Sequence, residues 1–233
     1  MTQLFDAAGE VVPVTVIQAG PCDVLRLRTT AVDGYEAVQI GYLDKPRRLA
    51  NRAERGQVAQ LDSKRSKARA KAGTEAPVKA NCEPKRLVRE YRGAVEGVAV
   101  GQKIDVGLFA EVKAVDVTAK TKGRGYSGWM KRHNFKGQRA THGVKKVHRH
   151  SGGTSGNTHP GRVFKNKKMP GQYGNERVTT RNITLVKVDA ENNLLLIKGS
   201  VPGPIGGYVS VRPTNLKKKI TVKTNVPKKG SKK

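Results

Sequence analysis

Short β-branched runs separated by turn residues dominate the first part of the chain. One run covers residues 11–17, where Pro13 interrupts the valines and marks a sheet edge or a bulge. Further apolar runs occupy residues 24–28 and 37–43, with turn-forming glycine, proline and aspartate between the runs. Several short strands joined by such turns predict an antiparallel barrel or sandwich.

The same pattern returns later in the chain. It predicts strands at residues 112–117 and 183–188, and the polar stretch 189–193 then reads as the turn of a hairpin with residues 194–198. Residues 208–212 form the last clear apolar run. The chain is therefore predicted to be mainly β, with antiparallel sheets.

Residues 119–182 show neither the period of a strand nor that of a helix. Lysine, arginine and glycine recur there, Glu176 is the only acid, and all five histidines and the only tryptophan, Trp129, fall in this segment. Loops longer than about 12–15 residues are uncommon inside a compact domain, and they are usually functional or disordered. The segment is therefore the first candidate for a functional region.

The charge balance of the whole chain sharpens this picture. Its 233 residues include 46 Lys and Arg against 18 Asp and Glu, a formal net charge of +28, and only 36% are hydrophobic. Part of the chain must therefore lack a packed core, and a polyanion is expected to neutralise the charge. No stretch approaches the length of a membrane span. Cys22 and Cys82 are far apart and are expected to be reduced thiols.

Two interpretations compete for residues 119–182: a solvated charge run and a nucleic-acid surface. Five aromatic residues are interspersed among the lysines and arginines, and a segment that is merely charged and solvated has no need of them. They are Tyr126, Trp129, Phe135, Phe164 and Tyr173. Nucleobases stack on aromatic rings while Lys and Arg neutralise phosphates. We therefore expect a nucleic-acid binder whose segment 119–182 orders on its partner, although this chemistry does not separate RNA from DNA.

Residues 45–92 differ again, because the first part of this stretch is rich in alanine, arginine and lysine. Residues 46–56 and 63–73 have good helix propensity, and Gly56 and Gly73 are predicted to cap the two helix ends. The apolar stripe is thin, so packing stabilises such helices little. A solvated basic insert and a second RNA-facing surface both remain open.

Three enzyme-like or metal-binding signals fail on context. Residues 123–128 match GxGxxG, but no helix pattern follows and no acid stands about 20 residues on, as a dinucleotide site requires. The neighbours of His148 and His150 are bases that repel a metal cation. Acids are nearly absent where the histidines lie, so no catalytic triad is supported. We expect no enzyme, cofactor, metal or small-molecule substrate.

Several motifs follow one another along the chain in a recognisable order. They are Gly107-Leu-Phe-Ala, Lys122-Gly-Arg-Gly-Tyr-Ser-Gly128, Lys131-Arg-His-Asn-Phe135, Thr141-His-Gly143, Pro160-Gly-Arg-Val-Phe164 and Leu194-Leu-Leu-Ile-Lys-Gly-Ser-Val-Pro-Gly203. Their content and order resemble the large-subunit ribosomal protein L3 family in its bacterial form. The resemblance covers nearly the whole chain except about residues 45–80 and the tail.

This resemblance implies an antiparallel, translation-protein-type β-barrel with a small helical basic insert and a long irregular basic arm. The implied protein binds 23S ribosomal RNA near its 3′ end, nucleates early subunit assembly and extends the arm toward the peptidyl transferase centre. It is a cytoplasmic ribosome constituent that neighbours other large-subunit proteins, and it is neither a membrane protein nor a homo-oligomer. The expected parts are barrel strands at 1–44, 87–118 and 183–212, the insert at 45–86, the arm at 119–182 and a basic tail at 213–233.

The predicted RNA contacts all lie in the arm and share positive charge, an imidazole or an aromatic ring. One lobe is expected around Trp129 and another around residues 150–162. The full set is Lys122, Arg124, Trp129, Lys131, Arg132, His133, Phe135, His142, His148, Arg149, His150, His159, Arg162, Lys165, Lys167 and Lys168.

The sequence departs from the family pattern at three places. Family members usually carry a further strand of roughly ten residues before the match at Met1-Thr2-Gln3. Either the start of the chain is assigned too late, or the barrel lacks that strand and exposes an edge. Residues 45–80 look longer and more basic than usual. Some bacterial members have a methylated glutamine in the arm, and the matching stretch 155–159 has no glutamine.

Two rival functions fit the sequence less well. A DNA-compacting protein is allowed by charge alone, but no groove-reading helix or dimer pattern supports it. An enzyme with a flavin or nucleotide module would need an acid/base pair or a phosphate loop, and the sequence offers neither.

Overall fold

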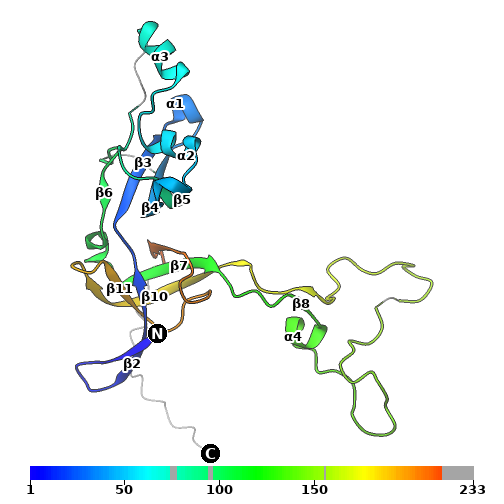
Figure 1. The fold of residues 1–233 in the computed structure, drawn as a ribbon. Coiled ribbons are helices and arrows are strands. Elements are labelled where there is room, and N and C mark those ends of the chain that lie inside the picture. Colours follow the sequence, from blue (N-terminus) through cyan, green and yellow to red (C-terminus); the bar gives the residue numbers. More distant parts are fainter. Residues whose placement is uncertain (74–77, 94–96, 155, 217–233) are drawn as a thin grey trace, which may run out of the picture. The chain divides into compact units, whose positions relative to one another are not determined.

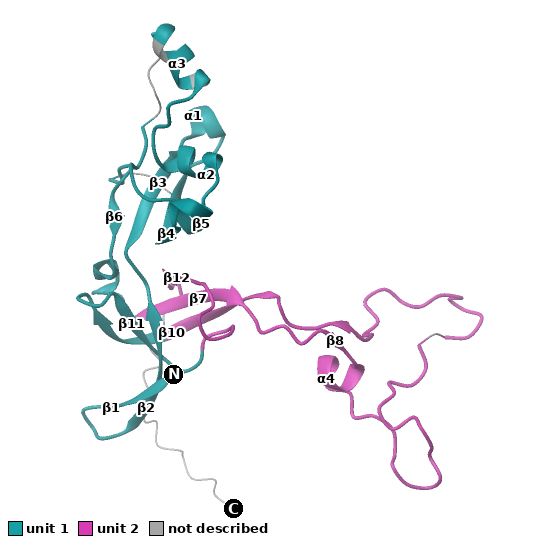
Figure 2. Ribbon diagram, in the orientation of Figure 1, with its two compact units in different colours: residues 1–113, 184–200 teal, residues 114–183, 201–233 magenta. Residues whose placement is uncertain are grey.

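The structure, a computed structural model, describes residues 1–73, 78–93, 97–154 and 156–216. The chain forms two compact units (Figure 2). Unit 1 comprises residues 1–113 and 184–200, and unit 2 comprises residues 114–183 and 201–233. The long strand β10 (Arg177–Asp189) contributes residues to both units.

The first sheet of unit 1 is antiparallel, as predicted. It contains β1 (Thr2–Phe5), β2 (Val11–Gln18), β11 (Leu194–Lys198) and the second half of β10, in the order β1-β2-β11-β10. Val14 and Ile17 of β2 are buried together with Leu195 and Ile197 of β11. Pro13 lies just beyond the last β2–β11 pair, Val14 with Lys198, so its missing N–H removes no bond of that ladder.

The second sheet of unit 1 has the order β5-β4-β3-β6. Its strands are β3 (Cys22–Arg28), β4 (Ala37–Asp44), β5 (Lys85–Arg92) and β6 (Lys103–Ile104). Between β3 and β4 the short helix α1 (Thr30–Asp33) ends at Gly34, whose φ of +77° only glycine adopts readily. The turn predicted there is confirmed.

The basic insert of unit 1 contains two helices, as predicted, and a short 3-10 turn, η1 (Arg47–Leu49). Helix α2 (Arg52–Val58) starts at a capping box in which the Asn51 side chain accepts from the Glu54 N–H at 2.8 Å. Helix α3 (Lys64–Lys71) follows. A second 3-10 turn, η2 (Val106–Phe109), comes after β6.

The prediction that Gly56 caps the first of these helices is wrong. Gly56 lies inside α2, which continues to Val58. The reason is tertiary, because Val58 is buried and Gln57 Nε2 donates to Gln39 Oε1 of β4 at 2.9 Å. Gly73 has a φ of +64° just past α3, which agrees with the predicted helix end.

Unit 2 is built on β7 (Ala114–Lys120), β12 (Val209–Pro213) and the first half of β10, in the order β10-β7-β12. Val115, Val117 and Ile183 are buried there. β10 begins at Arg177, earlier than the predicted start at Ile183, because its β-branched residues extend the strand and Thr179 Oγ1 lies 2.8 Å from Thr118 Oγ1 of β7.

Beyond this sheet, unit 2 holds the ribbon of β8 (Tyr126–Ser127) and β9 (Gly171–Gln172) and the helix α4 (Trp129–His133). The described residues from 134 to 170 contain only turns, bends and irregular backbone. They form the long loops that follow α4 in Figure 1. The absence of helical or strand periodicity predicted this.

The mainly β, antiparallel fold class is confirmed, but a closed barrel is not found among the described residues. The sheet of unit 1 ends at β1, the sheet of unit 2 ends at β12, and the β5-β4-β3-β6 sheet ends at β5 and β6. Closure would require such end strands to hydrogen-bond to each other. No helix in the described part of the chain is long and apolar enough to cross a membrane.

Candidate nucleic-acid interface

Two chain segments of unit 2 run side by side where the basic region begins. The Thr121 N–H donates to Glu176 O, the Arg124 N–H to Tyr173 O and the Tyr173 N–H to Gly125 O, each at 2.9 Å. β8 and β9 then pair, with Tyr126 opposite Gln172. This ladder joins the start of the basic region to its end. The residues between them therefore form one long loop that is closed at its base.

Gly174 makes this close approach possible. Its φ is +71°, and a Cβ at this position would collide with the carbonyl oxygen of Lys122. The Arg124 guanidinium lies 5.0 Å from the centre of the Tyr173 ring, a cation–π distance that fixes the two strands further.

Helix α4 is held from one side by hydrogen bonds to the backbone that precedes β9. Trp129 Nε1 donates to Lys168 O at 3.1 Å, and Arg132 Nη1 donates to Met169 O at 2.8 Å. His133 Nε2 lies 3.0 Å from the same Met169 oxygen. Trp129, Arg132 and His133 were all predicted to contact RNA. In the structure, polar atoms of their side chains contact the protein backbone instead, and all three residues are half-buried.

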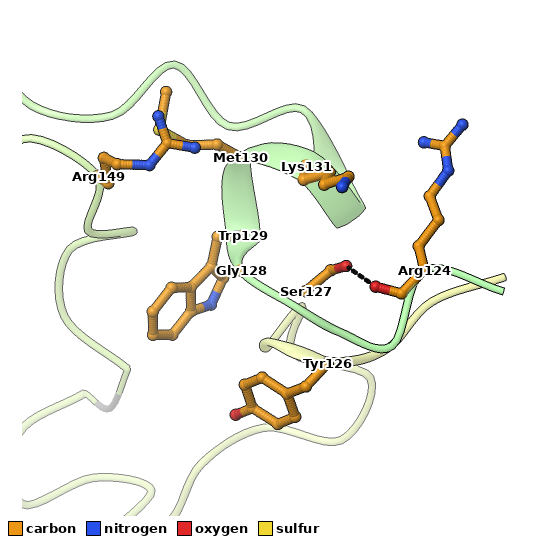
Figure 3. Close-up of a pocket in the computed structure, with 8 residues that line it drawn as sticks. All are labelled: Arg124, Tyr126, Ser127, Gly128, Trp129, Met130, Lys131 and Arg149. Atoms are coloured by element: carbon orange, nitrogen blue, oxygen red, sulfur yellow. Dashed lines mark hydrogen bonds between the residues drawn. The ribbon is translucent and has the colours of Figure 1, made fainter.

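A hollow of about 320 Å³ opens beside α4 (Figure 3). It brings together four of the predicted RNA contacts with residues of the β8 turn. Its lining residues are Arg124, Tyr126, Ser127, Gly128, Trp129, Met130, Lys131 and Arg149. The hollow thus combines three cationic side chains with two aromatic rings, the combination that stacks a nucleobase and holds its phosphate.

Tyr126 and Met130 also line the hollow, although the set of predicted RNA contacts does not include them. Tyr126 is 78% exposed and lies beside Trp129 at the hollow. The signal for Tyr126 was present, because it is an aromatic residue between glycines in the basic segment. Met130 carried no such signal, since only the path of α4 places it at the hollow.

A second loop closes around His148. The Gln138 N–H donates to His148 O at 2.9 Å, and His148 Nδ1 lies 3.0 Å from Arg139 O. Gly137, with a φ of +81°, packs so tightly against the His148 carbonyl that a Cβ would not fit. His142 is exposed within this loop.

The structure does not bring the other predicted contacts to the hollow. Arg132 and His133 of α4 are half-buried, as is Phe135, whose ring meets the His133 ring edge-on at 6.2 Å. The rest lie exposed along the irregular backbone: Lys122, His142, His148, His150, His159, Arg162, Lys165, Lys167 and Lys168. Within the described residues, no group of three or more His, Cys, Asp or Glu could hold a metal ion.

The charges of this region are uncompensated. Residues 122–168 contain no Asp or Glu. Among the described residues, the ion pairs lie elsewhere, for example Arg28 with Asp33 and Arg47 with Glu83 at 2.7 Å. No acidic side chain therefore neutralises the Lys and Arg of residues 122–168 among the described residues, and their positive charge can attract a polyanion.

Together, these features define the class: an antiparallel β protein with an irregular cationic segment that carries aromatic rings. Sequence comparison gives the family. The model of the family "Ribosomal protein L3" matches residues 94–193. The large ribosomal subunit protein uL3 of Rhodopirellula baltica is 64% identical over 215 residues, which cover 92% of this chain and 94% of that protein.

Further relatives agree. The uL3 proteins of Corynebacterium jeikeium and Petrotoga mobilis are 47% and 46% identical over 213 residues, which cover 91% of this chain and 89% and 90% of those proteins. This chain belongs to the ribosomal protein L3 family. The resemblance read from the motifs is thereby confirmed.

Proposed function

We propose that this chain is a structural constituent of the large ribosomal subunit and binds 23S ribosomal RNA directly. The binding site lies near the 3′ end of that RNA, binding nucleates early subunit assembly, and residues 119–182 form an arm toward the peptidyl transferase centre. Family membership supports the first statement, because the relatives are named large ribosomal subunit proteins. The family resemblance supports the rest.

One observation supports RNA binding best. Residues 122–168 expose lysines and arginines without any acidic residue, and three of these side chains line the hollow at α4 together with the rings of Tyr126 and Trp129. Each phosphate that such a surface neutralises releases condensed counterions, which supplies binding free energy and makes binding depend on salt.

The geometry of α4 suggests different roles for neighbouring residues. Lys131 and Arg149 are exposed at the hollow and neutralise phosphates. Arg132 and His133 point their polar atoms at Met169 O, so they position the helix. The ring of Trp129, anchored through Nε1, stacks against a base.

The remaining parts of the proposal concern the whole chain. The β strands of 1–44, 87–118 and 183–212 act as the framework, 45–86 as a basic insert and 213–233 as a basic tail, of which residues 217–233 lie outside the described residues. The protein works in the cytoplasm as one copy among neighbouring ribosomal proteins, and it has no catalytic role, cofactor or small-molecule substrate.

Deletion of residues 122–168 tests this proposal. The deletion removes β8 and α4 but joins the chain next to the Thr121–Glu176 hydrogen bond, so the larger sheets remain intact and the protein should fold. We expect poor incorporation into large subunits and abnormal polysome profiles when the shortened chain is the only copy. Deletion of residues 64–73, which are also basic, serves as the control. Normal polysomes with the 122–168 deletion would contradict the proposal.

A further inference from the structure

Three adjacent strands of unit 2 place one buried carboxylate between two arginines. Asp116 of β7 is fully buried. Arg212 stands directly opposite Asp116 in β12, and its Nη2 lies 3.6 Å from Asp116 Oδ2. From the other neighbouring strand, β10, Arg181 Nε lies 3.5 Å from the same oxygen. None of the three residues belongs to residues 122–168.

The backbone of β10 holds the carboxylate in place. The Asn182 N–H donates to Asp116 Oδ1 at 2.9 Å, and Asn182 adopts a φ of +55°, an uncommon value for a residue within a strand. This N–H, with help from Thr214 and Arg181 and against the effect of burial, lowers the pKa of Asp116. Asp116 is therefore a fixed negative charge that orients whatever packs against it.

The two guanidinium groups retain donors and exposure. Asp116 Oδ2 accepts no hydrogen bond from the described residues, and the Arg181 and Arg212 side chains remain 46% and 60% exposed. Arg181 Nη2 donates to Asn215 Oδ1 at 2.7 Å, which fixes its direction. Two positive charges and one negative charge leave the group with a net positive charge at the surface.

The two arginines are close enough for one small anion to contact both. Because both nitrogens lie against one oxygen, they are at most about 7 Å apart. Charge-assisted N–H···O bonds are about 2.8 Å long, so one phosphate group can accept from both guanidinium groups. Two arginines this close repel each other unless an anion is present, and Asp116 compensates only one of them.

We propose that Arg181 and Arg212 form a phosphate clamp, preorganised by Asp116, that binds one backbone phosphate of ribosomal RNA. This inference rests on the proposed function, because RNA supplies the phosphate. The clamp is separate from the hollow beside α4 and extends RNA binding from the irregular segment to the sheet of unit 2. Its specificity comes from the planar guanidinium fork rather than from charge alone.

The test measures binding of the full-length chain to 23S ribosomal RNA as a function of salt. The double variant Arg181→Gln/Arg212→Gln should bind about tenfold more weakly at moderate salt, and the magnitude of its log–log salt slope should fall by about 0.7 to 0.9, which corresponds to one phosphate. Arg181→Lys/Arg212→Lys keeps the charge but loses the fork, so it should still bind several-fold more weakly. The control Lys120→Gln/Arg177→Gln removes two exposed charges from β7 and β10 and should lose less.

The variant Asp116→Asn distinguishes RNA binding by a preorganised clamp from RNA binding by overall positive charge. This variant makes the chain more positive, so simple electrostatic attraction would strengthen binding, whereas loss of arginine orientation should weaken it. Circular dichroism checks that Asp116→Asn folds. If it does not fold, RNA binding by Arg181→Lys/Arg212→Lys tests the clamp in its place. Unchanged binding of the lysine variant, or equal losses in the glutamine and control variants, would overturn the clamp.

Two further outcomes separate the alternatives. Failure of the unaltered chain to bind the RNA would contradict the proposed function itself. Inorganic phosphate alone provides the other arm. A rise in the unfolding temperature with phosphate that Arg181→Gln/Arg212→Gln abolishes, without any loss in RNA binding, would assign the site to free phosphate and overturn the RNA assignment.

Discussion

Gly174 is the residue on which the base of the irregular segment depends. Its positive φ lets the chain turn, and its missing Cβ leaves room for the Lys122 carbonyl. Gly125 also has a positive φ, +61°, but a Cβ there would meet nothing within 4 Å. A substitution at Gly125 therefore introduces backbone strain alone, whereas one at Gly174 introduces backbone strain and a steric clash.

We predict that Gly174→Ala opens the β8–β9 ribbon while Gly125→Ala does not. Alanine in the left-handed region costs about 1–2 kcal/mol at either position, but only at Gly174 must the backbone also move. Hydrogen exchange of the Arg124 and Tyr173 amides measures the effect, since these two amides form the ladder. Exchange should rise at least about tenfold more in Gly174→Ala, which corresponds to roughly 1.4 kcal/mol. Equal exchange in both variants would refute the role of Gly174.

At the scale of elements, the two sides of α4 differ in role, although its basic residues Lys131 and Arg132 are adjacent in sequence. Arg132 donates to Met169 O, whereas Lys131 is exposed at the hollow. A helix of five residues is not stable alone, so its contacts with the chain before β9 must hold it.

We predict that Arg132→Gln loosens α4 and that Lys131→Gln does not. Losing a hydrogen bond from a charged donor costs about 1.5 kcal/mol, roughly a tenfold increase in local opening. The amides of Arg132 and Asn134, which bond to Gly128 O and Met130 O, report this opening by hydrogen exchange. For RNA binding the expectation is that both variants weaken it, Lys131→Gln without any change in exchange. A loosened helix in Lys131→Gln would contradict this division of roles.

At the scale of the whole molecule, the few acidic residues have a structural task. Hydrogen bonds from Tyr35 and Arg28, opposed by partial burial, lower the pKa of Glu90. Lys45 and the Asn51 N–H lower the pKa of Glu54, and Arg47 lowers that of Glu83. In a chain with 46 Lys and Arg and a net charge of +28, the 18 Asp and Glu residues also offset part of the charge repulsion.

We predict that the RNA-free chain loses stability in mild acid. A carboxyl group with a lower pKa in the folded than in the unfolded chain stabilises the fold above its unfolded value of about 4, and this contribution is lost as the pH falls. The midpoint of thermal unfolding should therefore drop between about pH 5 and pH 3.

One variant checks the cause of that acid loss. Glu90→Gln removes one of the responsible groups, so it should be less stable at pH 7 and show a flatter pH profile. The same midpoint at pH 7 and pH 3 in the unaltered chain would show that these ion pairs contribute nothing.

Much of the fold and part of the site were predictable from local pattern. β2, β3, β4 and β11 lie where the apolar runs between turn residues predicted strands, because apolar side chains are buried where a strand packs into the core. The cationic segment was evident from composition alone, and the motifs identified the family. Arg124, Trp129, Lys131 and Arg149, all predicted, meet at one hollow.

Other features depend on which elements become neighbours, and local pattern carries no such information. α2 continues through Gly56 because Gln57 and Val58 find partners outside the helix, and the polar atoms of Arg132 and His133 turn inward because Met169 O lies within reach. Asp116, Arg181 and Arg212 are far apart in sequence and meet only because β10, β7 and β12 pair side by side. Residue types and their spacing thus specified strands, charge and family, while long-range pairing decided which charged groups hold the fold and which face a partner.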